Sequence, residues 1–179
     1  MSDAPLVESA VLVPFVRDAA GAWRLVVIRR TPGGVHSGQL AFPGGRVDAA
    51  DATPLETALR EAWEEIGLPR ERVRVIAELP RIETRTTGFA ITPFLALAER
   101  PAAWTPAPAE VAEILEPSLA DLRAPDSRRH ANDLLPEGWR QVLLPYFAVG
   151  EHRLWGASER ILHPLLERIA AGEWVELLS

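Results

Sequence analysis

The sequence has no cysteine among its 179 residues, so disulfide bonds and thiolate metal sites are excluded. It also has no uncharged apolar run approaching the roughly 18 residues of a membrane-spanning helix. The first residues lack a basic segment followed by an apolar one, which is the pattern of a secretory signal. We therefore expect a cytoplasmic protein that does not bind membranes.

Excess positive charge is also lacking, since 25 Asp and Glu outnumber 19 Lys and Arg and the formal net charge is −6 at neutral pH. A chain of this sign is poorly suited to nonspecific binding of nucleic acid or anionic lipid. Phosphate recognition would have to be local, through a metal ion and a few arginines. The length and the 47% hydrophobic content suit one domain over residues 1–179, with residues 1–6 as a flexible terminus.

Hydrophobic periodicity predicts more strands than helices, in an order typical of an α/β fold without internal repeats. Helices are predicted at 53–66 and 158–170, with a short one near 117–122. The predicted strands are 9–16, 23–29, 40–42, 73–79, 89–98, 141–147 and 153–155.

The first predicted helix has clear signals at both ends. Thr53 suits the N-cap and Pro54 the first helical position, while Glu56 predicts a capping box with Thr53. Gly67 supplies the stop.

This helix carries three glutamates, Glu61, Glu64 and Glu65, within roughly a 100° arc. Like charges so close together are unfavourable unless a cation neutralises them, and carboxylate oxygens are ligands that Mg²⁺ and Mn²⁺ prefer. Arg60 lies four residues before Glu64, where a salt bridge would orient that carboxylate. Charged residues on a helix often form only its solvated face, but here the run follows a glycine pair and a capped helix start.

The stretch from Gly45 to Leu68, with REAWEEIGL at 60–68, resembles the Nudix box of the Nudix hydrolases. Two features depart from the box: Asp51 replaces a glutamate, and eight rather than seven residues separate it from Arg60. The resemblance implies an α/β/α sandwich with a mixed β-sheet. It also implies that the metal ligands are Glu61, Glu64, Glu65 and the carbonyl of Gly45.

Residues 36–45, HSGQLAFPGG, resemble the coenzyme A pyrophosphatase branch of this family, and Arg29 also fits. Residues 154–162 resemble the closing element of the same branch. Gly34 stands where the branch has a second arginine. The resemblance implies that the substrate contacts Arg29, His36, Phe42 and Gly44. Arg29 could instead form a structural salt bridge, and His36 could hold its loop.

The implied reaction is hydrolysis of the diphosphate of coenzyme A or its thioesters to 4′-phosphopantetheine and adenosine 3′,5′-bisphosphate. The expected catalytic residues are Arg60, Glu64, Glu65 and, as general base, Glu110. An ordinary acid at a helix start is the alternative for Glu110, and Glu83 is the weaker candidate base. Other possible substrates are ADP-ribose, a dinucleotide polyphosphate or a nucleoside triphosphate, and a non-catalytic nucleotide-binding module is a third reading.

Residues 123–138 lack periodicity and are predicted to be a mobile loop, either a lid or a solvated linker. Trp104 and Trp155 are candidates for stacking on a ligand, although tryptophan is more often part of the core. The sequence leaves open whether the protein is a monomer or a homodimer.

Overall fold

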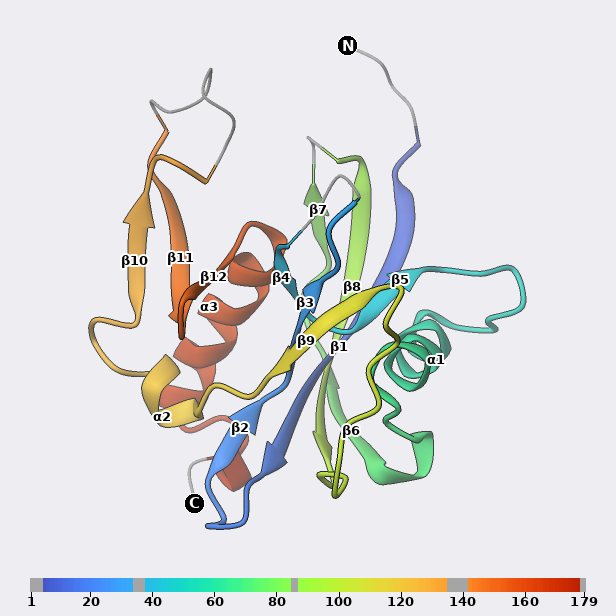
Figure 1. The fold of residues 1–179 in the computed structure, drawn as a ribbon, viewed down its shortest axis with the longest axis horizontal. Coiled ribbons are helices and arrows are strands. Elements are labelled where there is room, and N and C mark those ends of the chain that lie inside the picture. The colour runs from blue at the N-terminus through green and yellow to red at the C-terminus, as the bar shows by residue number, and fades with distance from the viewer. Residues whose placement is uncertain (1–4, 34–37, 85–86, 135–141, 178–179) are drawn as a thin grey trace.

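The centre of the fold is β1, Val7–Arg17, whose residues are buried on both faces of the sheet. The computed structural model describes residues 5–33, 38–84, 87–134 and 142–177, so most of the predicted flexible terminus at 1–6 lies outside it (Figure 1). In it, β1 pairs in parallel with β8, Phe89–Ala98. The other pairings are antiparallel, so this six-stranded sheet is mixed. Its remaining strands are β2 Trp23–Leu25, β5 Gly44–Arg46, β6 Val73–Glu78 and β7 Ile82–Thr84.

Two three-stranded antiparallel sheets complete the described β-structure. One has the order β4-β3-β9, with β4 Leu40–Ala41, β3 Val27–Arg30 and β9 Val111–Leu115. The other has the order β10-β11-β12, with β10 Arg128–Ala131, β11 Leu144–Val149 and β12 His152–Trp155. The single strand predicted at 23–29 is thus two strands, since β2 pairs with β1 and β3 belongs to another sheet.

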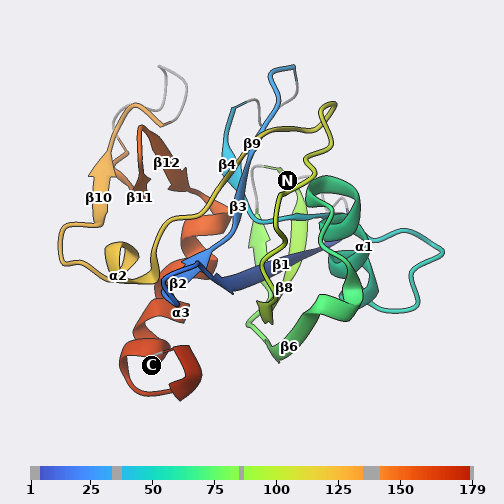
Figure 2. The same cartoon turned by 60° about the horizontal axis from the view of Figure 1, so that its bottom comes forward.

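Helices α1, Pro54–Ile66, and α3, Ala157–Ala170, lie on opposite sides of the six-stranded sheet (Figures 1 and 2). Alternate residues of β1 explain this layering, because Leu12 packs in the core cluster with α1 whereas Val13 packs in the cluster with α3. The predicted α/β/α arrangement with a mixed sheet is confirmed. The shorter helical segments are α2 Leu119–Leu122, η1 Arg70–Arg72 and η3 Val175–Leu177.

Several short strands were not predicted from the sequence: β5, β7, β9 and β10. Strand β10 lies within residues 123–138, so the prediction of a mobile loop is wrong for this part. Arg128 pairs with Phe147 of β11, and its side chain bonds to the buried Glu159 of α3 at 2.8 Å. Residues 135–138 of that segment lie outside the described part. Within the described residues, no helix is long and apolar enough to cross a membrane.

Candidate active site

Helix α1 is held in place by its two ends and its apolar face. The Thr53 hydroxyl accepts a hydrogen bond from the Glu56 backbone N–H at 3.2 Å, and Gly67 ends the helix with a left-handed φ of 67°, both as predicted. The capping box is not closed as expected, because the Glu56 carboxylate accepts from Ala52 N at 2.9 Å rather than from Thr53. The apolar face of α1, which includes Ala58, Ala62 and Ile66, packs against β1 and β8.

Glu65 is the most deeply buried of the three glutamates, with 2% of its surface exposed. Its Oε2 accepts a hydrogen bond from the backbone N–H of Gly44 at 2.9 Å, and its Oε1 lies 3.9 Å from Arg30 Nη2. Burial raises the pKa of Glu65 from an ordinary 4.5 to about 7, while the Gly44 bond and Arg30 oppose that rise. A carboxylate held here gains strongly from a neighbouring cation.

Glu61 lies against the backbone of Gly45, and a Cβ atom added at Gly45 would collide with the Glu61 carboxylate. Glycine at this position therefore lets the carboxylate approach the main chain. Burial is the largest influence on Glu61 and raises its pKa, whereas hydrogen bonding from Arg60 lowers it. The contact brings together two of the ligands that the family resemblance implies.

Arg60 holds the remaining glutamate, as the sequence predicts. Its Nη1 donates to Glu64 Oε2 at 3.0 Å and to Glu61 Oε1 at 2.9 Å. Its Nε and Nη2 donate to Asp51 on the preceding loop, at 3.1 Å to Oδ1 and 3.0 Å to Oδ2. The side chain of Glu64 is 53% exposed, so one carboxylate of the set faces solvent.

Glu110, the candidate general base, lies in the turn before β9 and not at a helix start, but it is exposed to solvent, as that alternative expected. The turn is tied to α1 by a hydrogen bond from Ala107 N to Glu65 O at 2.9 Å. Besides burial, the negative charge of Glu110 contributes, as the smallest of the named causes, to the raised pKa values of Glu61 and Glu65. Glu83 is on β7, where Arg81 Nη1 lies 3.8 Å from its carboxylate.

The donors gathered here are carboxylate and carbonyl oxygens, which fits a hard divalent cation such as Mg²⁺ or Mn²⁺. In the described residues, however, no three His, Cys, Asp or Glu side chains already converge as a closed ligand set. Arg60 Nη1 donates to both Glu61 and Glu64, so these two carboxylates are bonded to its guanidinium. Glu61, Glu64, Glu65 and the Gly45 carbonyl could hold an ion once these carboxylates turn toward it.

The four residues predicted to contact the substrate are Arg29, His36, Phe42 and Gly44, and those that the structure describes are engaged within the protein. Arg29 forms the structural salt bridge, with Nε 3.0 Å from Glu113 Oε2. Phe42 is 1% exposed and belongs to the core on the α3 side, which leaves it no surface for a ligand. Gly44 is buried in β5 and uses its N–H to bind Glu65. His36 and Gly34 lie outside the described residues.

Arg30 is the residue that sequence reasoning missed. Val26 and Ile28 pack in the core on the α1 side, and alternation along the strand would have placed Arg30 on that same side. The two candidate tryptophans lie elsewhere: the indole N–H of Trp104 donates to Glu116 and its ring packs against the α1 core, while Trp155 is half-buried in β12.

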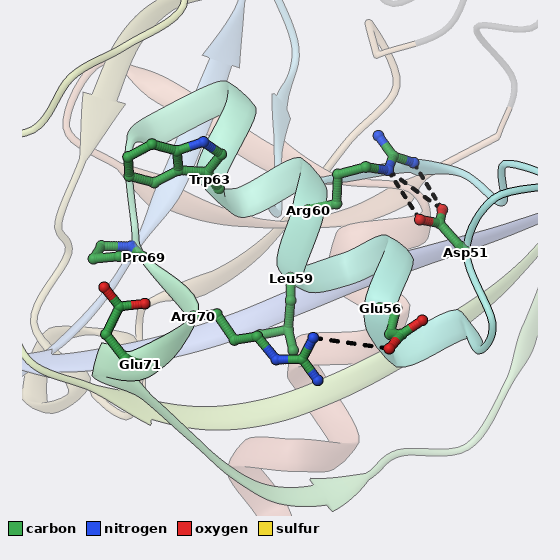
Figure 3. Close-up of a pocket in the computed structure, with 8 residues that line it drawn as sticks. All are labelled: Asp51, Glu56, Leu59, Arg60, Trp63, Pro69, Arg70 and Glu71. Atoms are coloured by element: carbon green, nitrogen blue, oxygen red, sulfur yellow. Dashed lines mark hydrogen bonds and ion pairs between the residues drawn. The ribbon is translucent and has the colours of Figure 1, made fainter.

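A hollow of about 550 Å³ runs along the outer face of α1 (Figure 3). Trp63, which is 58% exposed, lies at one end, and Arg60 and Asp51 lie at the other. None of Glu61, Glu64 and Glu65 lines it. The buried Glu65 and the backbone of Gly44 therefore meet outside this hollow.

Comparison with known proteins agrees with this geometry. The NUDIX domain model matches residues 7–137. A protein from Klebsiella pneumoniae called uncharacterized Nudix hydrolase NudL is 36% identical over 171 residues, covering 92% of this chain and 83% of that protein. Its namesake from Pectobacterium atrosepticum is 34% identical over 165 residues, covering 91% and 83%.

Solved structures show the same fold at lower identity. A MutT/nudix family protein from Enterococcus faecalis superposes with a TM-score of 0.62 at 18% identity, covering 96% of this chain and 64% of that one. A C. elegans Ap4A hydrolase in a binary complex gives 0.54 at 21% identity, covering 65% and 82%. These structures show the fold, while the family match and the NudL relatives indicate a hydrolase that acts on pyrophosphate bonds. The chain belongs to the Nudix family.

Proposed function

We propose that this protein is a Mg²⁺- or Mn²⁺-dependent pyrophosphohydrolase, acting as one domain on the diphosphate of coenzyme A or its thioesters. The observation that carries the chemistry is the buried Glu65 carboxylate, which accepts a hydrogen bond from Gly44 N–H and lies one helical turn from Glu61. A merely solvated acidic helix face has no reason to bury a carboxylate.

In this proposal, Glu61, Glu64, Glu65 and the Gly45 carbonyl hold the metal. When bound, a divalent ion neutralises charge on the phosphoryl oxygens and lowers the pKa of an attacking water. Other residues of the chain hold these carboxylates in fixed orientations. Gly44 N–H fixes one oxygen of Glu65, and Arg60 restrains the rotamer of Glu64.

Glu110 is the proposed general base, which accepts a proton from the attacking water. Glu110 ends a turn whose backbone is hydrogen-bonded to two neighbouring segments. Thr31 N donates to Glu110 O at 3.0 Å, and Ala107 N donates to Glu65 O at 2.9 Å. These bonds fix the backbone of the turn, and the exposed Glu110 side chain extends from that fixed position.

The substrate assignment rests on the branch-like segments at 36–45 and 154–162, together with the identity to NudL proteins over most of the chain. Those relatives are named as uncharacterized, so they do not specify a substrate. The second candidate is another nucleoside diphosphate derivative such as ADP-ribose, a dinucleotide polyphosphate or a nucleoside triphosphate. The presence of Gly34 where the coenzyme A pyrophosphatase branch has an arginine favours retaining this second candidate.

A substrate panel tests the proposal. Purified protein would be incubated with Mg²⁺ or Mn²⁺ and coenzyme A, acetyl-coenzyme A, ADP-ribose, diadenosine polyphosphates or nucleoside triphosphates, and the products separated by chromatography. We expect adenosine 3′,5′-bisphosphate from the coenzyme A compounds. Turnover of other compounds only would transfer the assignment to the second candidate, and no turnover of any would favour a binding module.

Substitution of the carboxylates tests the site. Glu64→Gln and Glu65→Gln should each lower kcat at least about 100-fold while the protein stays folded. Glu99→Gln is a matched control, because Glu99 is an exposed glutamate just after β8. A folded Glu64→Gln/Glu65→Gln double variant with full activity would remove the assignment.

A further inference from the structure

Strand β3 ends in two consecutive arginines whose side chains lie on opposite faces. Arg29 Nε is 3.0 Å from Glu113 Oε2, and His152 Nε2 of β12 is 3.5 Å from the same atom. Arg30 Nη2 is 3.9 Å from Glu65 Oε1 on α1. The pairing of β3 with β9 is irregular between these two arginines. Of these two neighbouring arginines, Arg29 therefore belongs to a structural ion pair and Arg30 lies near a carboxylate of the candidate active site.

The two contacts differ in kind. The Arg29 pair is at hydrogen-bond distance and is completed by a histidine, so this guanidinium is already engaged. The separation of Arg30 from Glu65 exceeds hydrogen-bond distance. Arg30 thus offers charge to the site without committing its donors to Glu65, and its side chain is 37% exposed.

The backbone of Arg30 is firmly placed although its side chain reaches into solvent. Arg30 N donates to Gln39 O at 3.0 Å, and its carbonyl accepts from Gly38 N at 3.2 Å. The next residue, Thr31, binds the turn that carries Glu110, both through its N–H and through its hydroxyl to Ala109 O at 2.9 Å. The backbone of Arg30 is therefore fixed next to the turn that carries the proposed general base, and its side chain reaches Glu65.

We propose that Arg30 is the phosphate-binding arginine of this enzyme, donating to phosphoryl oxygens of the substrate's diphosphate. The inference rests on the proposed function. Once Glu65 serves a divalent cation, its charge no longer compensates Arg30, and a guanidinium beside that cation requires another anion. A diphosphate supplies one, with oxygens that match the planar fork of the guanidinium.

Arg30→Met tests this with a readout that needs no turnover. Calorimetry would measure the binding of ADP and of inorganic pyrophosphate to wild type and variant in Mg²⁺. We expect affinity to fall about 10- to 100-fold in Arg30→Met and to be partly recovered in Arg30→Lys. Arg74→Met is the matched control, because Arg74 is also a strand arginine with a carboxylate at 3.8 Å, on the remote strand β6.

A second measurement separates phosphate binding from a structural role. Removing a cation next to Glu65 should leave Mn²⁺ affinity without nucleotide unchanged or increase it, while ADP affinity falls. A parallel loss of both affinities would overturn the inference, as would ADP affinity within about twofold of wild type. A larger loss in Arg29→Met than in Arg30→Met would also overturn it.

The two proposals can fail independently. If wild type hydrolyses none of the panel but binds ADP in an Arg30-dependent way, the inference stands and only the hydrolytic function fails. If it hydrolyses coenzyme A while Arg30→Met binds ADP normally, only the inference fails. If wild type binds neither ADP nor pyrophosphate, the inference is overturned.

Discussion

Asp51 and Arg60 form a two-point ion pair across the start of α1, with Nε 3.1 Å from Oδ1 and Nη2 3.0 Å from Oδ2. Asp51 also accepts from the Thr57 hydroxyl at 2.7 Å. It stands where the Nudix box has a glutamate, one residue farther from the arginine than usual. The pair shows how the longer loop is accommodated: Asp51 folds back onto the helix and anchors the guanidinium that orients Glu64.

Asp51→Asn should therefore weaken the positioning of Arg60 and Glu64, although Asp51 is not itself a proposed metal ligand. The hydrogen bond from Arg60 is the main cause of the lowered pKa of Asp51. The ion pair therefore contributes its full stabilisation of the fold above the ordinary Asp pKa. That stabilisation is lost only as the pH falls through the lower pKa of Asp51 in the folded protein. At pH 7 we expect a loss of about 1 to 3 kcal/mol in urea unfolding and roughly a tenfold drop in kcat. Asp48→Asn, an exposed change in the same loop, is the control, and equal effects of the two would contradict the prediction.

Glu65 should make the metal-free protein less stable as pH rises. Its folded pKa is raised from an ordinary 4.5 to about 7, mainly by burial. Between these values the folded state keeps the proton that the unfolded state releases, so stability falls with increasing pH, by about 3 kcal/mol overall. Urea unfolding with a chelator should show this slope in wild type and not in Glu65→Gln. Parallel pH profiles would contradict the raised pKa.

The two glycines of β5 should respond differently to alanine. A Cβ at Gly44 would collide with the backbone at Ala10 and Val11, so Gly44→Ala should lower the free energy of unfolding by about 2 to 3 kcal/mol. At Gly45 the collision is with the movable end of Glu61. Gly45→Ala should remain within about 1 kcal/mol of wild type but bind Mn²⁺ roughly tenfold more weakly. Thermal unfolding and Mn²⁺ titration measure the two effects, and the reverse order would refute this reading.

Glu110→Gln should lower kcat by about 100-fold or more with little change in KM, because the amide cannot accept the proton of the attacking water. Glu83→Gln is the informative comparison, since Glu83 is the other candidate base. We expect it to retain activity within about twofold. A larger loss in Glu83→Gln than in Glu110→Gln would reverse the assignment.

Much of the fold follows from local patterns. The capped helix α1, the arc of Glu61, Glu64 and Glu65, and the orienting role of Arg60 depend on residues within one or two helical turns, where spacing determines which side chains are neighbours. The long strands β1 and β8 likewise have apolar sequences that can be recognised without their partners. The short strands β5, β9 and β10 lack that signal, because three to five residues carry too little periodicity.

The sequence by itself thus determined the family, the acidic helix face and the layering of the core. Only the tertiary structure decided how that face is used. Gly44 and Glu65 are 21 positions apart and Arg29 and Glu113 are 84 apart, and neither pair is marked by spacing. These contacts come from the burial of distant segments against one another, which places Glu113 beside Arg29 and Glu65 beside Arg30.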